Sequence, residues 1–280
     1  MTSPIRLAIS TCPNDTFAFH ALMNRLVDWQ GLEFEIQLLD IQQLNDGLFN
    51  RSFDIAKSSF HAALLLADDW YVLPSGSALG FGVGPLLLAS CPDTVPTHSS
   101  QVTLCPGQHT TATMLFRMFY SDTTTIQHAL FSDIMPALHN KTADFGVCIH
   151  EGRFTWQQEG LSLVEDLGTK WEQATNQPLP LGGILANRSL PEDVISRAQS
   201  VIKDSILFAR SDPKSALPTM RHHAQEFDDD VLMQHVNLYV NDWTVELADV
   251  GTAALNELSI RAKQVGLTDS TASELQIFQS

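Results

Sequence analysis

The stretch "GFGVGPLLLAS", residues 80–90, decides the fold that the sequence predicts. It begins rich in glycine, turns strongly apolar, and interrupts a regular alternation of strands and helices. A second apolar run bounded by proline and glycine, "LPLGGILANRS", follows at 179–189. Two such runs predict that the chain crosses between two lobes twice, near residues 84–90 and 182–187.

The chain before the first crossing alternates between strand and helix patterns. Short apolar runs predict strands, and longer stretches with apolar residues three to four positions apart predict helices. Strands are expected at 5–10, 32–40 and 53–59, and helices at 16–29, 41–50 and 60–69. This order is typical of a parallel sheet covered by helices.

The chain after the first crossing repeats this organisation and then becomes helical. Strands are expected at 102–105, 125–131 and 145–150, with helices at 110–122 and 132–140. Beyond the second crossing, helices are expected at 191–210, 212–225, 228–240 and 244–265. We therefore predict an α/β fold of two lobes joined by two crossover strands, with a helical C-terminal region packed on the first lobe.

The crossings also predict the division of the chain. Residues 1–89 and 186–280 should form a discontinuous large lobe, and residues 90–185 a small lobe. A molecule of two lobes with two crossings binds its ligand in the cleft between them, by hinge motion at the crossings.

Composition narrows the class of protein. The 280 residues are 44% apolar and 17% charged, which indicates a globular protein with a sizeable core. The formal net charge of −16 disfavours nucleic acid and anionic membranes as partners, because both are negatively charged. No apolar run reaches the roughly 18 residues of a membrane span. The first residues lack the pattern of an export signal, so we expect a cytoplasmic protein with no membrane span.

Unusual polar sequences follow four of the predicted strands. They are "STCPNDT" at 10–16, "KSS" at 57–59, "CPGQHTT" at 105–111 and "HEGR" at 150–153. Ligands of open parallel sheets bind beyond the carboxyl ends of the strands. Two of these strand exits come from each expected lobe, so we expect them to face one another across one cleft.

Two of the strand exits also suit helix capping. Asn14 and Asp15 lie where a helix N-cap belongs, so capping by one of them is as good an interpretation as ligand contact. Thr110 and Thr111 open another helix behind Gly107, a residue that allows close backbone approach. Capping needs only one hydroxyl, and a helix start offers free N–H groups to an anion, so we favour ligand binding there.

Lys57 ends an apolar strand and has two interpretations of similar weight. A lysine is commonly a surface residue whose stem packs on apolar neighbours. However, Ser58, Ser59 and a very apolar helix follow directly. That context would hold the ammonium group near the cleft, where it could pair with a substrate carboxylate.

His150 is the strongest candidate for a catalytic group, although a single histidine at a strand end is more often structural. The apolar run "DFGVCI" before it places it at the carboxyl edge of the sheet. An unperturbed histidine titrates at about pH 6.5, so a modest environment makes it a general base. Glu151 should point to the opposite side of the strand, and Arg153 either pairs with it or joins the binding site.

The sequence gives little support for a metal or a nucleotide. The 4 cysteines form no CxxC pair and no zinc-like spacing. His222 and His223 could pair with Glu226 on a helix, but the aspartates that follow indicate an ordinary polar face. Phosphate-loop and GxSxG motifs are missing. We therefore expect neither metal nor cofactor.

Five motifs in register give the chain a specific resemblance. They are "CPNDTF" at 12–17, "GVGPLLLA" at 82–89, "PGQHTTA" at 106–112, "IHEGRFT" at 149–155 and "LPLGGILA" at 179–186. Together they closely resemble the 1,4-dihydroxy-6-naphthoate synthases, lyases of the futalosine route to menaquinone. The resemblance extends over at least residues 5–260.

The resemblance implies a fold, a reaction and a set of site residues. It implies a periplasmic-binding-protein type II-like fold in a cytoplasmic enzyme. That enzyme would cleave cyclic dehypoxanthine futalosine, a small anionic substrate, to 1,4-dihydroxy-6-naphthoate without metal or organic cofactor. It implies His150 as proton acceptor. The substrate-binding residues expected are Lys57, Ser58, Ser59, Thr110, Thr111, Asn14 and Arg153.

Two other functions fit the same fold. A cytoplasmic solute-binding protein would need the cleft but no base. A chorismate dehydratase shares the fold but lacks the His-Glu-x-Arg-Phe pattern that begins here at His150.

Overall fold

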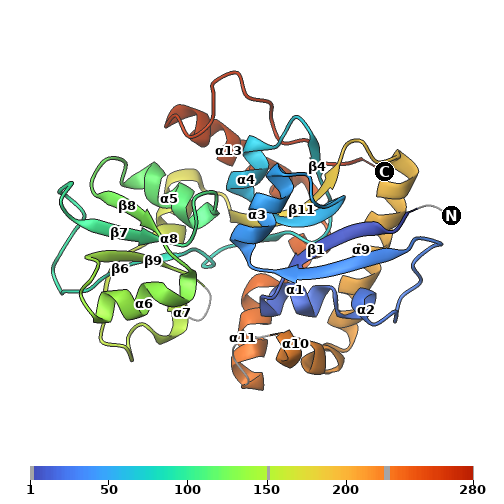
Figure 1. Cartoon of the computed structure of the whole chain (residues 1–280), viewed down its shortest axis with the longest axis horizontal. Coiled ribbons are helices and arrows are strands. Elements are labelled where there is room, and N and C mark those ends of the chain that lie inside the picture. The colour runs from blue at the N-terminus through green and yellow to red at the C-terminus, as the bar shows by residue number, and fades with distance from the viewer. Residues whose placement is uncertain (1–2, 150–151, 224–227, 280) are drawn as a thin grey trace.

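The computed structural model of the chain describes residues 3–149, 152–223 and 228–279. It consists of two lobes, each built around its own sheet, with C-terminal helices beside the first lobe (Figure 1). This arrangement confirms the expected two-lobe α/β fold with a helical C-terminal region.

The first sheet combines strands from the N-terminal third of the chain with one strand that comes much later. Within the described ranges its strands are β1 (Ile5–Ser10), β2 (Phe34–Leu39), β3 (Ile55–Ser59), β4 (Trp70–Val72), β5 (Ala78–Gly80) and β11 (Leu179–Asn187). Their order is β2-β1-β3-β11-β4, and β5 also pairs with β11. β1 is parallel to β2 and β3, whereas β11 is antiparallel to β3, β4 and β5.

The second sheet lies wholly between the two crossings. Its described strands are β6 (Leu86–Ala89), β7 (Val102–Cys105), β8 (Thr125–His128), β9 (Phe145–Cys148) and β10 (Ser162–Asp166). Their order is β10-β6-β9-β7-β8. β7 is parallel to β8 and β9, and β6 is antiparallel to β9 and β10.

The expectation of parallel sheets is therefore wrong where the chain crosses. β6 and β11 enter their sheets from the other lobe, against the direction of the neighbouring strands β9 and β3. Parallel pairing needs a crossover connection that returns the chain to the same end of the sheet. A strand that arrives from the other lobe has no such connection behind it.

The helices cover the faces of the sheets and form the C-terminal region. Those of the first two thirds are α1 (Pro13–Ala18), α2 (His20–Met23), α3 (Ile41–Phe49), α4 (Phe60–Leu65), α5 (Thr111–Phe119), α6 (Phe131–His139), α7 (Gly152–Thr155) and α8 (Leu167–Thr175). They are followed by α9 (Glu192–Ser211), the 3-10 helix η1 (Pro213–Ala216), α10 (Leu217–His223), α11 (Asp229–Tyr239), α12 (Asp242–Val245) and α13 (Ala248–Gln264).

The helix expected at 16–29 is wrong in length, because α1 and α2 end by Met23. Arg25 adopts a left-handed φ of 54°, which a continuing helix cannot contain. The sequence analysis also did not predict β4, β10 or α8. β4 has 3 residues and β10 is only partly buried, so neither carries a strong apolar period.

A buried apolar cluster extends from one lobe into the other. Phe60 and Leu185 of the first lobe belong to it, together with Phe116, Val147 and Trp171 of the second. All five are at most 1% exposed. Full burial of such a side chain contributes about 1.5–3 kcal/mol, so the lobes are packed on each other through a shared core beside the cleft.

The crossing into the second lobe depends on close contact between two glycines. A β carbon at Gly84 would lie 2.2 Å from Cα of Gly168, and one at Gly168 would lie 2.6 Å from Cα of Gly84. Both distances are too short for any side chain. The backbone before β6 is therefore pressed against the start of α8, which fixes one rim of the interlobe region.

The change of sheet falls close to the expected lobe boundaries. It occurs between Gly80 and Leu86 and again between Asp166 and Leu179. As a division of the chain into folding units, 1–89 with 186–280 and 90–185 stays a prediction. No helix within the described ranges is both long and apolar enough to cross a membrane.

Candidate active site

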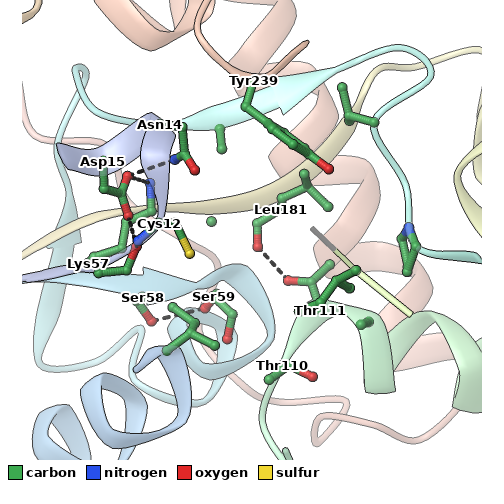
Figure 2. A pocket seen from close by; sticks show the side chains of 18 of the residues that line it. Cys12, Asn14, Asp15, Lys57, Ser58, Ser59, Thr110, Thr111, Leu181 and Tyr239 are labelled. Atoms are coloured by element: carbon green, nitrogen blue, oxygen red, sulfur yellow. Dashed lines mark hydrogen bonds and ion pairs between the residues drawn. The ribbon is translucent and has the colours of Figure 1, made fainter. Parts of the chain in front are cut away.

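A cleft between the lobes lies at the carboxyl ends of β1, β3 and β7 (Figure 2). Its empty volume, counted to the open mouth, is about 740 Å³. The first lobe contributes Ser10, Cys12, Asn14, Asp15, Ile41, Lys57, Ser58, Ser59, Ala78, Leu181 and Gly182, and the second lobe and the crossing contribute Val83, Gly84, Pro85, Thr110, Thr111, Ala112 and Ile149. Three of the four polar strand exits thus meet in one cleft, as does the residue before the fourth.

Lys57 is buried in the first-lobe wall rather than placed on the surface. Its Nζ lies 2.8 Å from Oδ1 of Asp15, and only 6% and 4% of these two side chains are exposed. Nζ also donates to the carbonyl of Gly76 at 3.0 Å, and Oδ2 of Asp15 accepts from Ser10 Oγ at 2.5 Å. Such a buried pair needs further hydrogen bonds to its charges, and here Gly76 and Ser10 supply them.

The expectation that Asn14 or Asp15 caps the first helix is wrong. The N-cap of α1 is Cys12, and no side-chain cap is formed there. Asp15 lies in the first turn, where a carboxylate suits the positive end of the helix. Its oxygens are committed to Lys57 and Ser10, which a local capping rule cannot reveal.

Asn14 links the ion pair to the C-terminal helices. Its Nδ2 donates to Oδ1 of Asp15 at 2.9 Å, which orients the amide so that its Oδ1 faces Nε2 of His235 at 3.1 Å. Because that oxygen only accepts, Nε2 of His235 carries the proton. The His235 ring packs against Tyr239, with ring centroids 4.6 Å apart, and both residues line the cleft.

α11 therefore forms a third wall that the sequence analysis did not include. Tyr239 projects over the cleft above Leu181 in Figure 2. The signal was present in part, because residues 235 and 239 are four positions apart and share one face of the expected helix. Nothing local in the sequence indicates that this face meets β1 and β3.

Of the two serines after Lys57, Ser59 bonds to the second lobe and Ser58 bonds within the first. Ser59 Oγ donates to the carbonyl of His109 at 2.6 Å and accepts from Asn45 Nδ2 at 2.9 Å. Ser58 is completely buried, and its Oγ donates to the carbonyl of Ser59 at 2.9 Å. Asn45, which the sequence analysis did not single out, is also completely buried and orients this exit.

The two threonines have different partners. Thr110 is the N-cap of α5: its Oγ1 accepts from the N–H of Thr113 at 3.3 Å and donates to the carbonyl of Gly107 at 3.1 Å. Thr111 Oγ1 donates across the lobes to the carbonyl of Leu181 at 2.6 Å, as Figure 2 shows. One hydroxyl caps the helix, and the other joins the walls of the cleft.

Arg153 does not line the cleft but contacts a residue that does. Its guanidinium pairs with Asp166 at 2.7 Å and donates to the carbonyl of Gly84, a lining residue. The pairing of Arg153 with Glu151 cannot be compared, because His150 and Glu151 lie outside the described residues. Ile149, immediately before them, does line the cleft.

Side chains that commonly bind metals do not cluster in the parts of the chain that the structure describes. No group of three or more His, Cys, Asp and Glu side chains there could hold an ion. His222 and His223 lie on α10, and Glu226 is outside the described residues.

Solved structures define the class of this protein as the two-lobe periplasmic-binding-protein fold. The ligand-binding component of an ABC-type import system from Staphylococcus aureus has a TM-score of 0.69 at 13% identity, covering 96% of this chain and 94% of that one. The aliphatic sulphonate binding protein SsuA from Escherichia coli has a TM-score of 0.65 at 12% identity, covering 100% and 95%. Protein AF1704 from Archaeoglobus fulgidus is more similar, with a TM-score of 0.89 at 30% identity over 95% and 98%.

Sequence comparison then gives the family. The family model described as menaquinone biosynthesis matches residues 5–264. The chain is 36% identical over 279 residues to the 1,4-dihydroxy-6-naphthoate synthase of Streptomyces coelicolor, covering 98% of each chain. It is 36% identical over 263 residues to that of Thermus thermophilus, covering 94% and 95%. The chain belongs to the menaquinone biosynthesis family, among its 1,4-dihydroxy-6-naphthoate synthases, which are lyases.

Proposed function

We propose that the chain cleaves cyclic dehypoxanthine futalosine and releases 1,4-dihydroxy-6-naphthoate. The observation that carries this proposal is the convergence of the exits after β1, β3 and β7 on one interlobe cleft. The family membership selects the reaction. A cleft between two lobes suits such a substrate, because closure excludes water and fixes the reacting geometry.

The substrate's carboxylate and hydroxyls are bound by groups from both walls. In this proposal the N–H groups at the start of α5, beside Thr110 and Thr111, bind the anion. Lys57 has one N–H beyond those that it donates to Asp15 and Gly76, and directs it to the ligand. Asn14, Ser58, Ser59 and Arg153, expected from the sequence as substrate-binding residues, line or support the walls of the same proposed site, the last through its contact with Gly84.

His150 is the proposed general base. It removes a proton from the substrate and so starts the elimination that severs the sugar-derived carbons. Formation of the aromatic ring then drives the step forward, so no metal or organic cofactor is required. Ile149 lines the cleft, and His150 is the next residue in the chain.

The proposed reaction is tested with cyclic dehypoxanthine futalosine and the full chain. A naphthoate chromophore identifies the lyase, and unchanged substrate that still binds identifies a solute-binding protein instead. Turnover of chorismate in a parallel reaction would identify a dehydratase. Either of the latter two outcomes overturns the proposal.

The base is tested with His150→Ala. Because a positioned base contributes about 10²–10⁴-fold, kcat should fall by that factor while circular dichroism stays unchanged. His98→Ala, at an exposed loop histidine, is the matched control and should keep full activity. Turnover of His150→Ala at the wild-type rate would remove His150 from the mechanism.

The cytoplasmic location of the protein and its lack of nucleic-acid partners stay predictions.

A further inference from the structure

Four hydroxyl groups at the cleft already use their protons in hydrogen bonds within the protein. A hydroxyl has one proton to donate and two lone pairs to accept with. Ser58, Ser59, Thr110 and Thr111 each donate to a backbone carbonyl, at 2.9, 2.6, 3.1 and 2.6 Å. In this closed arrangement these residues offer a ligand lone pairs rather than protons.

Most of these hydroxyls are also closed to a ligand. Ser59 accepts from Asn45, and Thr110 accepts from the N–H of Thr113, so both are engaged as donor and acceptor. Ser58 is completely buried. Thr111 differs, since no donor among the described residues points at its Oγ1, and the residue lines the cleft.

We propose that Thr111 is the specificity-determining acceptor for a hydroxyl group of the ligand, and not a carboxylate-binding residue. The inference rests on the proposed function and adds the direction of one hydrogen bond to it. A hydroxyl group of the ligand donates to Thr111 Oγ1 while Thr111 keeps its bond to Leu181.

The opposite direction is disfavoured on energetic grounds. To donate to a ligand carboxylate, Thr111 must leave the carbonyl of Leu181 without its partner. The bond to Leu181 is part-buried, so leaving its acceptor unpaired costs a share of the roughly 1–3 kcal/mol of a fully buried one. The exchange also loses one hydrogen bond for each that it gains. Accepting a proton from the ligand adds a bond and breaks none.

The contact between the lobes determines the direction of the hydrogen bond that Thr111 can form with a ligand. Thr111 lies on α5 of the second lobe and Leu181 on β11 of the first, so their bond exists only when the walls meet. The carboxylate is left to groups that still have protons to donate, namely Lys57 and the N–H groups at the start of α5. The ligand is therefore oriented with its acid group and its hydroxyl on different partners.

Two acids that differ only in their hydroxyl groups test the assignment. 1,4-Dihydroxy-6-naphthoate carries two hydroxyls on the carboxylated bicycle, and 2-naphthoate carries none. Their dissociation constants are measured by calorimetry with the full chain, and the ratio of the two constants is the readout. Wild type should favour the dihydroxy acid. Thr111→Val should reduce that preference by about three- to tenfold, and Thr111→Ser should retain it.

Arg261→Met is the matched control, because it also removes one interlobe hydrogen bond, from α13 to the carbonyl of Ala174 on α8, and Arg261 does not line the cleft. It should weaken both acids equally and leave their ratio unchanged. An unchanged ratio in Thr111→Val, or a wild type without preference, would overturn the assignment. If wild type turns over substrate while either result is seen, only this assignment fails. If wild type binds neither acid, the proposed function fails with it.

Discussion

The two walls of the cleft present different kinds of polar group to a ligand. The first-lobe wall holds a buried ion pair, Lys57 with Asp15, extended through Asn14 to His235. The second-lobe wall offers uncharged groups around Thr110 and Thr111. Buried charges need permanent partners, because a charge left alone in the interior is far more costly than an unpaired hydroxyl.

This difference indicates which wall is rigid and which wall moves. The partners of Lys57 all lie in the first lobe, so its geometry survives any opening of the cleft. Thr111 and Ser59 instead form hydrogen bonds between the lobes, so any opening of the cleft would break them. The changes below test this comparison, from the largest expected effect to the smallest.

Breaking the buried pair should have the largest effect on stability. Lys57→Met leaves the Asp15 carboxylate buried without its cation, so the free energy of unfolding should fall by about 3–5 kcal/mol. Urea denaturation measures it. The double variant Lys57→Met/Asp15→Leu removes both charges and should recover most of the loss. A single variant within 1 kcal/mol of wild type, on the order of a surface ion pair, would show that the wall is not built on this pair.

Acid should destabilise the fold through the buried ring of His61. Burial lowers the pKa of His61 to about 4, opposed by its contact with the Thr110 carbonyl and reinforced by the positive groups His109 and Arg117. Its Nδ1 lies 3.3 Å from that carbonyl.

The sign of the pH effect follows from the unfolded chain, where a histidine titrates at about 6.5. The folded state disfavours the proton, so the stabilisation is complete above pH 6.5 and is lost as the pH falls toward 4. At pH 5 the loss is about 2 kcal/mol. Urea denaturation at pH 7.5 and 5 should show an acid loss that is about 2 kcal/mol smaller in His61→Asn than in wild type. The remainder comes from other histidines whose pKa burial lowers, such as His20, His109 and His128. His98→Asn, at an exposed position, should behave as wild type. An equal acid loss in His61→Asn would assign the effect to other groups.

Removing one interlobe hydrogen bond should have the smallest effect. Ser59→Ala should lower the free energy of unfolding by about 1 kcal/mol, because Asn45 and the His109 carbonyl keep other partners within reach. The closed state should lose population, which small-angle scattering detects as a larger radius of gyration. A loss as large as that of Lys57→Met would contradict the division into a rigid and a moving wall.

The sequence predicted the position of the strand exits well where the signal was local. Strand exits were recognised because short apolar runs end in polar residues, and the sheet geometry then brings three of them together. Thr110 was correctly placed at a helix start, since capping depends on neighbours within one turn. The capping role for Asn14 or Asp15 failed because a distant lysine competes for the same carboxylate.

By itself, the sequence determined the alternation of elements, the two crossings and the polar strand exits, because these follow from periodicity and turn chemistry within a few residues. Only the tertiary structure decided the partners across the cleft. Thr111 and Leu181 are 70 positions apart, and Asn14 and His235 are 221 apart. It also decided the direction of β6 and β11, which depends on the lobe from which each strand arrives. Such pairings depend on how whole layers pack, and no local pattern of residues encodes that packing.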